Sequence, residues 1–424
     1  MKYTHVDIMK LNAIKFSACR DLVHSPRSLA SCYVSFFIHF LYKMVSFRWK
    51  LPDFKELLFV APTLNNKKAL GPICDNFSND SYTMLDDFGK QLPYSKIYFH
   101  SMLHLIDFHK EYQKVHQQDR PLVRYFFYDF ILAYGIYITI DQLLKKNSRL
   151  KVIVFANDHI LVNRCLIELA ASYHIKTLYT QHASVNGNFP SLLFSYSFLD
   201  GLDSFEKYRL IGHIMGKVFL SGNPRFDIIN NLKKGDEKAI GIAVNELDNI
   251  DILKNLCAYL SDNLNERIII RPHPSMEQMP VWNDLAKAGY VISYPTKENS
   301  FEFVAKLRLL VANESGIHLD ANLMKTPSVL YNFSTNPVMD WYSYIKNELM
   351  PVCSTKEDLL KCIQIGGKIN AEKIRYYNAA FDTSYEGKVS TVISGFIKGM
   401  LQDNEMECIT GIFMNHEDGY YSYM

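Results

Sequence analysis

The sequence lacks an excess of charge of either sign. Its 424 residues contain 46 lysines and arginines against 44 aspartates and glutamates, which leaves a net charge of +2. A protein whose main task is to neutralise a nucleic-acid backbone carries a clear basic excess. We therefore expect no nucleic-acid partner, and we expect any anion to be bound at a local site.

The sequence also lacks paired cysteines. None of its eight cysteines has another at the two-residue spacing of structural zinc sites and dithiol redox motifs. The start of the chain has no small-residue cleavage site of the kind that follows a secretory signal. We therefore expect neither a disulfide framework nor a cysteine metal site, and we expect a cytoplasmic protein.

Long apolar runs are scarce. Ser28–Tyr42 is uncharged and mostly apolar, but His39 interrupts it and it is shorter than the ~20 residues of a membrane span. Five basic residues flank it: Arg20, Arg27, Lys43, Arg48 and Lys50. The pattern fits a buried amphipathic helix, which we favour. It also fits a helix that lies on the inner face of the plasma membrane, with binding that weakens as salt rises.

Most of the chain alternates short β-type runs with helical patterns, which is typical of parallel sheets flanked by helices. We predict one sheet from Glu56–Ala61, Lys96–His100, Lys151–Ala156, Lys176–Thr180 and Lys217–Ser221. We predict a second sheet from Ala239–Val244, Arg267–Ile270, Tyr290–Ser293, Leu307–Ala312 and Ser328–Tyr331. A polar break at Pro224–Glu237 separates the two sets and is interpreted as a linker.

The predicted fold class is therefore α/β, with two facing Rossmann-like domains and a cleft between them. Residues 1–55 form an N-terminal helical segment, 56–225 the first domain, 238–400 the second domain, and 403–424 a tail. Helical patterns between Ala371 and Leu401 either complete the second domain or return to the first.

Ligands of open α/β sheets bind beyond the carboxyl ends of the strands. Arg271-Pro272-His273-Pro274-Ser275 directly follows a predicted strand. The prolines stiffen the backbone, while arginine and histidine side chains both bind phosphate oxygens. The segment predicts a phosphate site, with a rigid turn carrying a surface histidine as the alternative.

A second segment, Asn313–Asp320, also follows a predicted strand and opens a helical pattern. Ser315 has the chemistry of a helix cap, and Gly316 lets the backbone approach a ligand closely, as at phosphate-binding helix starts. Asp320 is placed to accept hydrogen bonds from ribose hydroxyls. The alternative is an ordinary helix cap followed by an ordinary helical acid.

Together these segments resemble the donor site of the CDP-glycerol glycerophosphotransferases of teichoic acid synthesis. Bacterial polysialyltransferases and the Kdo transferases of capsule assembly have similar pairs. The resemblance implies a GT-B fold whose C-terminal domain binds a nucleotide, usually cytidine, between the His-Pro and serine motifs. It matches His273, Ser315 and Asp320 to the motif residues, whereas the second serine of the usual pair is Gly316 here. The predicted donor site consists of Arg271, His273, Glu314, Ser315, Gly316 and Asp320, with His273 also catalytic.

The first half of the chain carries two weaker matches. Thr180-Gln181-His182-Ala183 is similar to the Gln-His-Gly of related envelope transferases, and Ser221–Asp227 resembles their Gly-Asn-Pro-Arg-Phe-Asp crossing between domains. A near-neutral pKa would suit His182 to deprotonate an acceptor hydroxyl, with binding alone as the alternative. Asp158 with His159 is a second candidate catalytic pair.

The sequence contains no Asp-x-Asp motif, so we expect a metal-independent mechanism without a cofactor. Arg271, His273 and the helix start at Ser315 would stabilise charge on a departing nucleotide phosphate. Asp200 and Asp203 are interpreted as a solvated turn.

The leading functional hypothesis is a glycosyltransferase of cell-surface polysaccharide synthesis, acting in capsule, O-antigen or lipooligosaccharide assembly. It would use a nucleotide-activated donor, preferably a cytidine nucleotide, and a saccharide or lipid-linked acceptor. A CDP-glycerol-type polyol-phosphate transferase is one alternative. A UDP-sugar 2-epimerase is another, since Glu314–Ile317 is similar to the Ser-Gly-Gly helix start of those enzymes, although Ala61-Pro62-Thr63-Leu64 replaces their Gly-Thr-Arg-Pro-Glu loop. The third is a non-catalytic scaffold.

Overall fold

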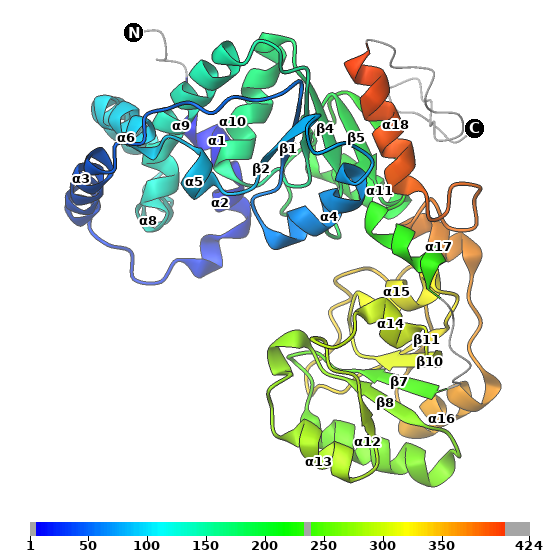
Figure 1. Cartoon of the computed structure of the whole chain (residues 1–424). Helices are drawn as coiled ribbons and strands as arrows, with labels where there is room; N and C mark the ends of the chain where they lie inside the picture. Colours follow the sequence, from blue (N-terminus) through cyan, green and yellow to red (C-terminus); the bar gives the residue numbers. More distant parts are fainter. Residues whose placement is uncertain (1–5, 233–238, 403–424) are drawn as a thin grey trace. The chain divides into compact units, whose positions relative to one another are not determined.

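The computed structural model describes residues 6–232 and 239–402. They form two compact units, one of residues up to 225 together with 388 onward, the other of residues 226–387. Each unit is a parallel β-sheet with helices packed on it (Figure 1). The predicted class of two Rossmann-like α/β domains is therefore confirmed. The predicted tail 403–424 and the linker end 233–238 lie outside the described residues.

The first unit contains a six-stranded sheet in the order β2-β1-β3-β4-β5-β6. All pairings are parallel. The strands are β1 (Leu57–Val60), β2 (Tyr82–Leu85), β3 (Val152–Phe155), β4 (Lys176–Thr180), β5 (Tyr196–Leu199) and β6 (Lys217–Leu220). Strands β1, β3 and β5 are buried along their whole length, which explains their continuous apolar runs.

The N-terminal helices of this unit pack on one another as well as on the sheet. The long helix α9 contacts α6 and α10, and α3 contacts α6. The helices before the sheet are α1 (Ile8–Leu11), α2 (Ala13–Ala18) and α3 (Leu29–Val45). Those between strands are α4 (Leu64–Cys74), α5 (Phe88–Gln91), α6 (Tyr94–Leu103), α7 (Leu105–Lys114), α8 (Arg120–Tyr125), α9 (Phe127–Lys146), α10 (Leu161–Ala170) and α11 (Leu202–Ile211).

The predicted strand Lys96–His100 is wrong, because these residues lie in helix α6. Ile97, Tyr98 and Ser101 are buried at helical spacing against α9. Gly135 of α9 makes this contact possible, since a Cβ atom there would lie 1.9 Å from the backbone oxygen of Ile97. The second strand of this sheet along the chain is β2 instead, and β5 is a further strand that the sequence pattern did not indicate.

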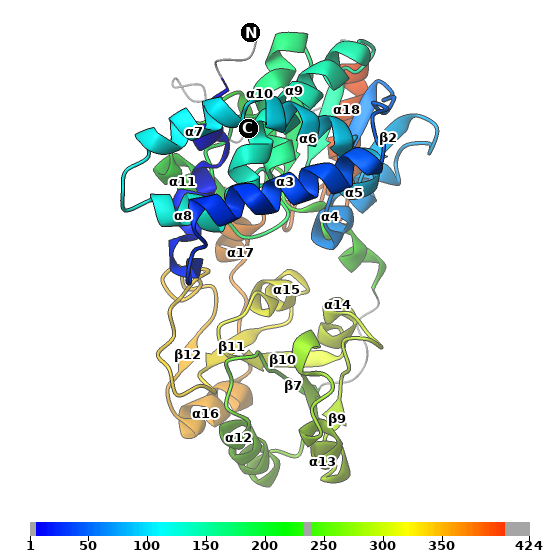
Figure 2. The same ribbon diagram turned by 90° about the vertical axis from the view of Figure 1, so that its left-hand side faces the viewer.

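The favoured burial of Ser28–Tyr42 is also wrong. The segment forms α3, and only Cys32 and Phe36 of this helix are buried. Figure 2 shows α3 running across one face of the first unit. Among the described residues, no helix is long and apolar enough to cross a membrane.

The second unit has a sheet in the order β12-β11-β10-β7-β8-β9, again with parallel pairings. Its strands are β7 (Ala239–Ala243), β8 (Ile268–Arg271), β9 (Val291–Ile292), β10 (Leu307–Ala312), β11 (Ser328–Tyr331) and β12 (Val352–Cys353). Its helices are α12 (Ile250–Asn263), α13 (Val281–Lys287), α14 (Ser300–Val304), α15 (Ile317–Leu323), α16 (Lys356–Ile365) and α17 (Ala371–Tyr377).

Alternate residues of β7 join different cores, as expected of a sheet covered on both faces. Ile240 and Ile242 pack with the α12 and α16 side chains, whereas Ala239 and Ala243 pack with Phe303 and Leu310. All five predicted strands of this sheet are present, and only the short edge strand β12 was not predicted.

Two differences concern the ends of the units. Within the predicted break Pro224–Glu237, Pro224–Asn231 forms a 3-10 helix. Helix α18 (Val389–Leu401) belongs to the first unit, although the predicted second domain ran to residue 400. Its buried Phe396 packs edge-on against Tyr196 and Phe198, and Ser394 Oγ donates to the Ile73 carbonyl. Burial of this apolar face against β5 and α4 explains why the helix returns to the first unit.

Candidate functional site

The strand order of the second unit reverses between β7 and β10. At such a switch point the loops after the two strands diverge and leave a crevice at the carboxyl edge, where α/β proteins bind ligands. The two loops here are joined by hydrogen bonds: Asn313 Nδ2 donates to Asp248 Oδ1 at 2.7 Å, and Asn245 Nδ2 donates to the Glu314 carbonyl at 3.3 Å. Both predicted motifs of this half therefore lie at or beside the switch point.

His273 follows β8, the neighbour of β7, and its ring is held on one side. Its Nδ1 lies 2.8 Å from Ser275 Oγ and 3.3 Å from Glu246 Oε1, and Ser275 Oγ also hydrogen-bonds Glu246. Nε2 makes no hydrogen bond to a residue in the described part of the chain. The side chain is 45% exposed, so the ring is oriented while its Nε2 edge stays accessible.

Arg271 is buried, and it is already used within the fold. Its guanidinium donates to Ser293 Oγ at 2.9 Å and to the Glu298 carbonyl at 3.1 Å, and lies 5.5 Å from the centre of the Phe303 ring. Burial lowers the pKa of Arg271, against the opposing effect of four nearby carboxylates. The structure thus gives this residue the contacts of an anchor for β8 and the loop after β9.

Glu314 has a similar anchoring role. Its carboxylate accepts backbone hydrogen bonds from Met339, Asp340 and Trp341. The side chain therefore fixes the loop that follows β11 against the loop that follows β10. Both carboxylate oxygens are occupied by these amides.

Ser315 does not cap α15 in the way the sequence predicted. The N-cap position is Gly316, and Ser315 Oγ accepts only a long hydrogen bond, 3.4 Å, from the Ile317 amide. The backbone N–H groups of Ser315 and Gly316 have no acceptor among residues 6–232 and 239–402. The turn thus offers two unused donors beside the switch point.

Asp320 is buried in α15, and its Oδ2 accepts a hydrogen bond from Ser300 Oγ at 3.1 Å. His318, which the sequence did not single out, is completely buried, and its Nε2 donates to the Asn313 carbonyl at 3.0 Å. Burial lowers the pKa of His318 to about 4, so the ring is neutral and its Nε2–H donates to that carbonyl. This contact holds the start of the 313–316 turn.

In the first unit, polar residues gather after β3 and β4, which are neighbours in the sheet. His159 Nδ1 lies 2.7 Å from Oδ1 of Asp158, although the groups are not aligned as a hydrogen bond. Asp158 is completely buried, and neither of its carboxylate oxygens has a hydrogen-bond partner among the described residues. The His182 ring, from the loop after β4, lies 6.2 Å from the His159 ring between centroids. The predicted catalytic residues His182 and Asp158 are thus brought together with His159.

The expectation of a near-neutral pKa for His182 is wrong. Burial, together with the neighbouring His159, lowers the pKa of His182 to about 4. An imidazole with this pKa is neutral at pH 7 but is a weak base. Its Nδ1 is buried without a partner in the described part of the chain.

Asp200 and Asp203 are not a solvated turn. Asn223 Nδ2 donates to both carboxylate oxygens of Asp200, at 3.1 and 3.3 Å, and also to the Gln181 carbonyl. Burial raises the pKa of Asp200 to about 7. Asp203 is buried too, and Lys207 Nζ lies 2.8 Å from its Oδ2. The loop after β4 is therefore held by the Ser221–Arg225 loop that follows β6.

Sequence reasoning missed Glu246, Asn245 and Asp248. All three lie directly after the predicted strand Ala239–Val244, so the same rule about strand ends that found His273 would have found them. Within the described ranges, no group of three or more His, Cys, Asp or Glu side chains is placed to hold a metal ion.

Comparison with solved structures identifies the architecture. The UDP-GlcNAc 2-epimerase from Neisseria meningitidis bound to UDP-GlcNAc is 12% identical, with 82% of this chain and 100% of that chain covered and a TM-score of 0.50. Another UDP-N-acetylglucosamine 2-epimerase is 9% identical, with 85% and 100% covered and a TM-score of 0.50. The chain has a GT-B-type fold.

The wall teichoic acid polymerase TagF also matches, at 12% identity, with 90% of this chain and 100% of that chain covered and a TM-score of 0.49. No protein-family model matches the sequence, and no curated protein sequence has significant similarity to it. The two epimerase structures, with TM-scores of 0.50, support the fold alone at these identities.

Proposed function

We propose that this GT-B-type protein is a nucleotide-dependent transferase of cell-surface polysaccharide synthesis. Its second unit binds the nucleotide-activated donor, and its first unit carries the group that activates an acceptor hydroxyl. The donor is a cytidine nucleotide sugar, and the acceptor is a saccharide or a lipid-linked saccharide. The same residues serve a CDP-glycerol-type donor, where the hydroxyl attacks phosphorus instead of a sugar carbon.

The observation that carries this proposal is that the loop after β7 contacts both motifs: Glu246 lies against the His273 ring, and Asn245 donates to the Glu314 carbonyl next to the two unused amides. An anionic phosphate accepts hydrogen bonds from backbone N–H groups and from an imidazole N–H, and these are stronger because one partner is charged. The Ser275 backbone N–H donates to Nδ1, which places the proton of a neutral imidazole on Nε2, and Glu246 lies against the same Nδ1 edge of the ring. Arg271, Glu314 and Asp320 support the site by fixing the surrounding loops.

In the transfer step, the acceptor oxygen attacks the anomeric carbon of the donor sugar and the bond from that carbon to the phosphate oxygen breaks. The nucleotide leaves with the electron pair, and the hydroxyl proton passes to a base. Donors already placed around the leaving phosphate stabilise the charge that develops there.

We assign the base to His159 rather than to His182. The Asp158 carboxylate, 2.7 Å from His159 Nδ1, stabilises the protonated ring that would form on proton transfer. His182, with its pKa of about 4, is better suited to hydrogen-bond the hydroxyl than to retain its proton. Asp158→Asn and His159→Asn should therefore abolish most turnover, whereas His182→Asn should retain more of it.

Thermal unfolding with separate additions of CMP, CDP, UDP and GDP tests donor binding. A ligand at 100 times its dissociation constant stabilises the native state by about 2.7 kcal/mol. We expect the cytidine nucleotides to raise the unfolding temperature most. His273→Ala should reduce this shift slightly, and Ser315→Pro, which blocks one of the two amides, should reduce it more. The absence of a shift with all four nucleotides would favour a scaffold role.

A UDP-sugar 2-epimerase is the second candidate, favoured by the fold match and by the glycine at position 316. Incubation with UDP-GlcNAc in D2O separates the two activities. Epimerisation through proton removal at C2 introduces deuterium at that carbon without any acceptor. The proposed transferase leaves C2 of UDP-GlcNAc unlabelled and releases nucleotide from its own cytidine donor only when an acceptor is present.

A further inference from the structure

Helix α3 exposes a continuous apolar stripe. Val34, Phe37, Ile38, Leu41 and Val45 recur at helical spacing, and each is between 49% and 82% exposed. Leu103 of α6 and Ile106 of α7 extend this surface, at 61% and 71% exposed. A contiguous apolar surface of this kind marks an interaction site, because folding alone would not leave it in water. We call these seven residues the α3 face.

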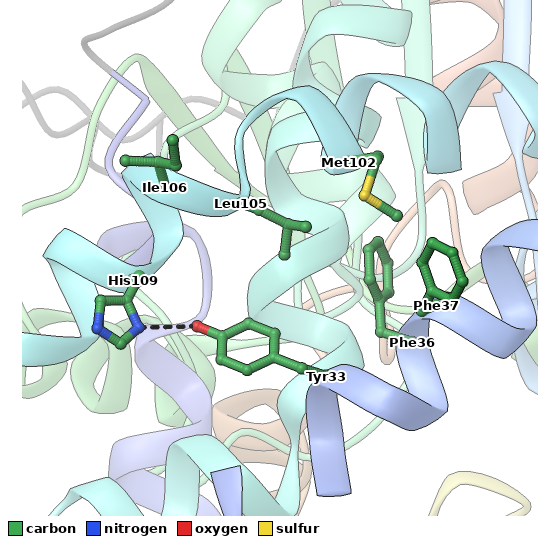
Figure 3. A pocket seen from close by; sticks show the side chains of 7 residues that line it. All are labelled: Tyr33, Phe36, Phe37, Met102, Leu105, Ile106 and His109. Atoms are coloured by element: carbon green, nitrogen blue, oxygen red, sulfur yellow. Dashed lines mark hydrogen bonds between the residues drawn. The ribbon is translucent and has the colours of Figure 1, made fainter. Parts of the chain in front are cut away.

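A groove of about 390 Å³ runs along the α3 face between α3 and the α6–α7 pair. Figure 3 shows aromatic side chains from α3 on one side and aliphatic side chains from α6 and α7 on the other. Its lining consists of Tyr33, Phe36, Phe37, Met102, Leu105, Ile106 and His109. The one polar contact within it joins Tyr33 Oη and His109 Nδ1, 3.1 Å apart, at the end of the groove. Such a lining fits a hydrocarbon chain.

The charge along α3 and its flanks is mainly basic, whereas α7 carries both signs, with Asp107 paired to His104 and Glu111 to Lys114. Residues 20–50 contain five lysines and arginines and a single acidic residue, Asp21. Lys43 and the exposed Tyr42 lie in the last turn of α3, and the exposed Phe47, Arg48 and Lys50 follow the helix. Aromatic and basic side chains at the rim of an apolar face are typical of helices that lie in the headgroup region of an anionic bilayer.

We propose that the α3 face is a membrane-docking surface that inserts into an anionic bilayer and takes a lipid acyl chain into its groove. A second copy of the chain is a poorer occupant. In a two-fold dimer through α3, the same basic rim would meet itself, and like charges repel. The inference concerns the first unit only and does not depend on the proposed transferase activity.

The structure also changes the expected salt dependence. Electrostatic attraction to anionic lipid is screened by salt, but burial of apolar side chains is not. We therefore expect salt to weaken binding severalfold and not to abolish it, unlike a purely electrostatic contact.

Sedimentation of the full chain with vesicles tests the proposal. Wild type should bind vesicles of phosphatidylcholine and phosphatidylglycerol at least tenfold more tightly than vesicles of phosphatidylcholine alone. The variant Ile38→Glu/Leu41→Glu should lose at least tenfold in affinity for the mixed vesicles. Leu210→Glu, on α11 and 88% exposed, is the matched control and should bind as wild type does. Because all three positions are exposed, thermal unfolding should be nearly unchanged.

Insertion needs a second measurement. In Phe37→Trp, vesicles containing brominated phosphatidylcholine should quench more tryptophan fluorescence than they do in wild type. Unchanged binding of Ile38→Glu/Leu41→Glu, or the absence of additional quenching, would overturn the proposal. A wild-type dimer that the double variant converts to a monomer, without vesicle binding by either, would overturn it in favour of a second copy.

Discussion

Replacing His273 by alanine tests the donor site most directly. The imidazole contacts only Ser275 and Glu246 among the described residues, and the side chains of His273 and Glu246 are 45% and 58% exposed. Exposed contacts of this kind contribute about 0.5 kcal/mol or less to stability. The unfolding temperature of His273→Ala should therefore stay within about 2 °C of wild type.

The effect on catalysis should be much larger. If Nε2–H donates to the departing phosphate, its removal costs an interaction that strengthens as charge develops. Deleting one such donor typically lowers kcat about 10²-fold, or about 2.7 kcal/mol in the activation barrier. KM for the donor should change less, because the ground-state phosphate is also held by the two amides of the 315–316 turn.

Nucleotide release in the presence of acceptor is the assay, with His213→Ala as a control at an exposed histidine of the first unit. Glu246→Gln should lie between wild type and His273→Ala, because it removes the charge that orients the ring but leaves the ring in place. Wild-type kcat in folded His273→Ala would refute the catalytic role. A rise in KM with unchanged kcat would reduce His273 to a binding residue.

Three further predictions concern the two units separately. Gly316→Ser restores the serine of the resembled motif, and folding should be unchanged because an added Cβ comes no nearer than 3.9 Å to Tyr342 Oη. Calorimetry should show that the variant binds nucleotide more tightly. Weaker or equal binding would argue against a phosphate at this turn. Burial raises the pKa of Asp200 to about 7 from its ordinary 3.8, so the contribution of this side chain to stability is complete below about pH 3.8 and is lost as pH rises to about 7. In urea unfolding, Asp200→Asn should therefore be more stable than wild type at pH 8, and this gain should vanish near pH 4. Burial lowers the pKa of His318 to about 4 from an ordinary 6.5, so the contribution of this side chain to stability is complete above about pH 6.5 and falls towards pH 4. In His318→Gln the loss of stability between pH 6.5 and pH 4 should be smaller, and an unchanged pH profile of stability would contradict this prediction.

The sequence predicted the two sheets well where strands are buried on both faces. Ile240, Ile242 and their neighbours form an apolar run because both faces of β7 are covered. It missed two edge strands, since β2 is only partly buried and β12 has two residues, so neither has a run that distinguishes it from a loop. It also missed the buried strand β5, where Ser197 interrupts a run of only four residues. The prediction for Lys96–His100 failed for a different reason. Its apolar residues also fit a strand, and only the contact of Ile97 with Gly135 of α9 favours the helix.

The sequence predicted the positions of the site residues better than their chemistry. The rule that ligands lie beyond strand ends placed His273, Ser315, His182 and Asp158 at the carboxyl edges of the sheets, where the structure has them. Their chemistry is decided by their surroundings, which come from segments distant in the chain. Neutral His182 and the carboxylate of Asp200 both depend on neighbours from other loops, and Arg271 and Glu314 have their polar atoms engaged by loops distant in sequence.

The buried carboxylates of the two units differ in a way that bears on function. Asp248 receives hydrogen bonds from Asn245 and Asn313, so its burial is compensated within the fold. Asp158 is equally enclosed, yet both of its oxygens lack a hydrogen-bond partner among the described residues, as do Nδ1 of His159 and Nδ1 of His182. A buried polar group without a partner costs about 1–3 kcal/mol, and more when it is charged. Asp158 has only the 2.7 Å approach of His159 Nδ1, and the His182 ring adjoins that pair, so the fold satisfies this carboxylate less well than it satisfies Asp248. This is why we place the acceptor chemistry at Asp158 and its two histidines.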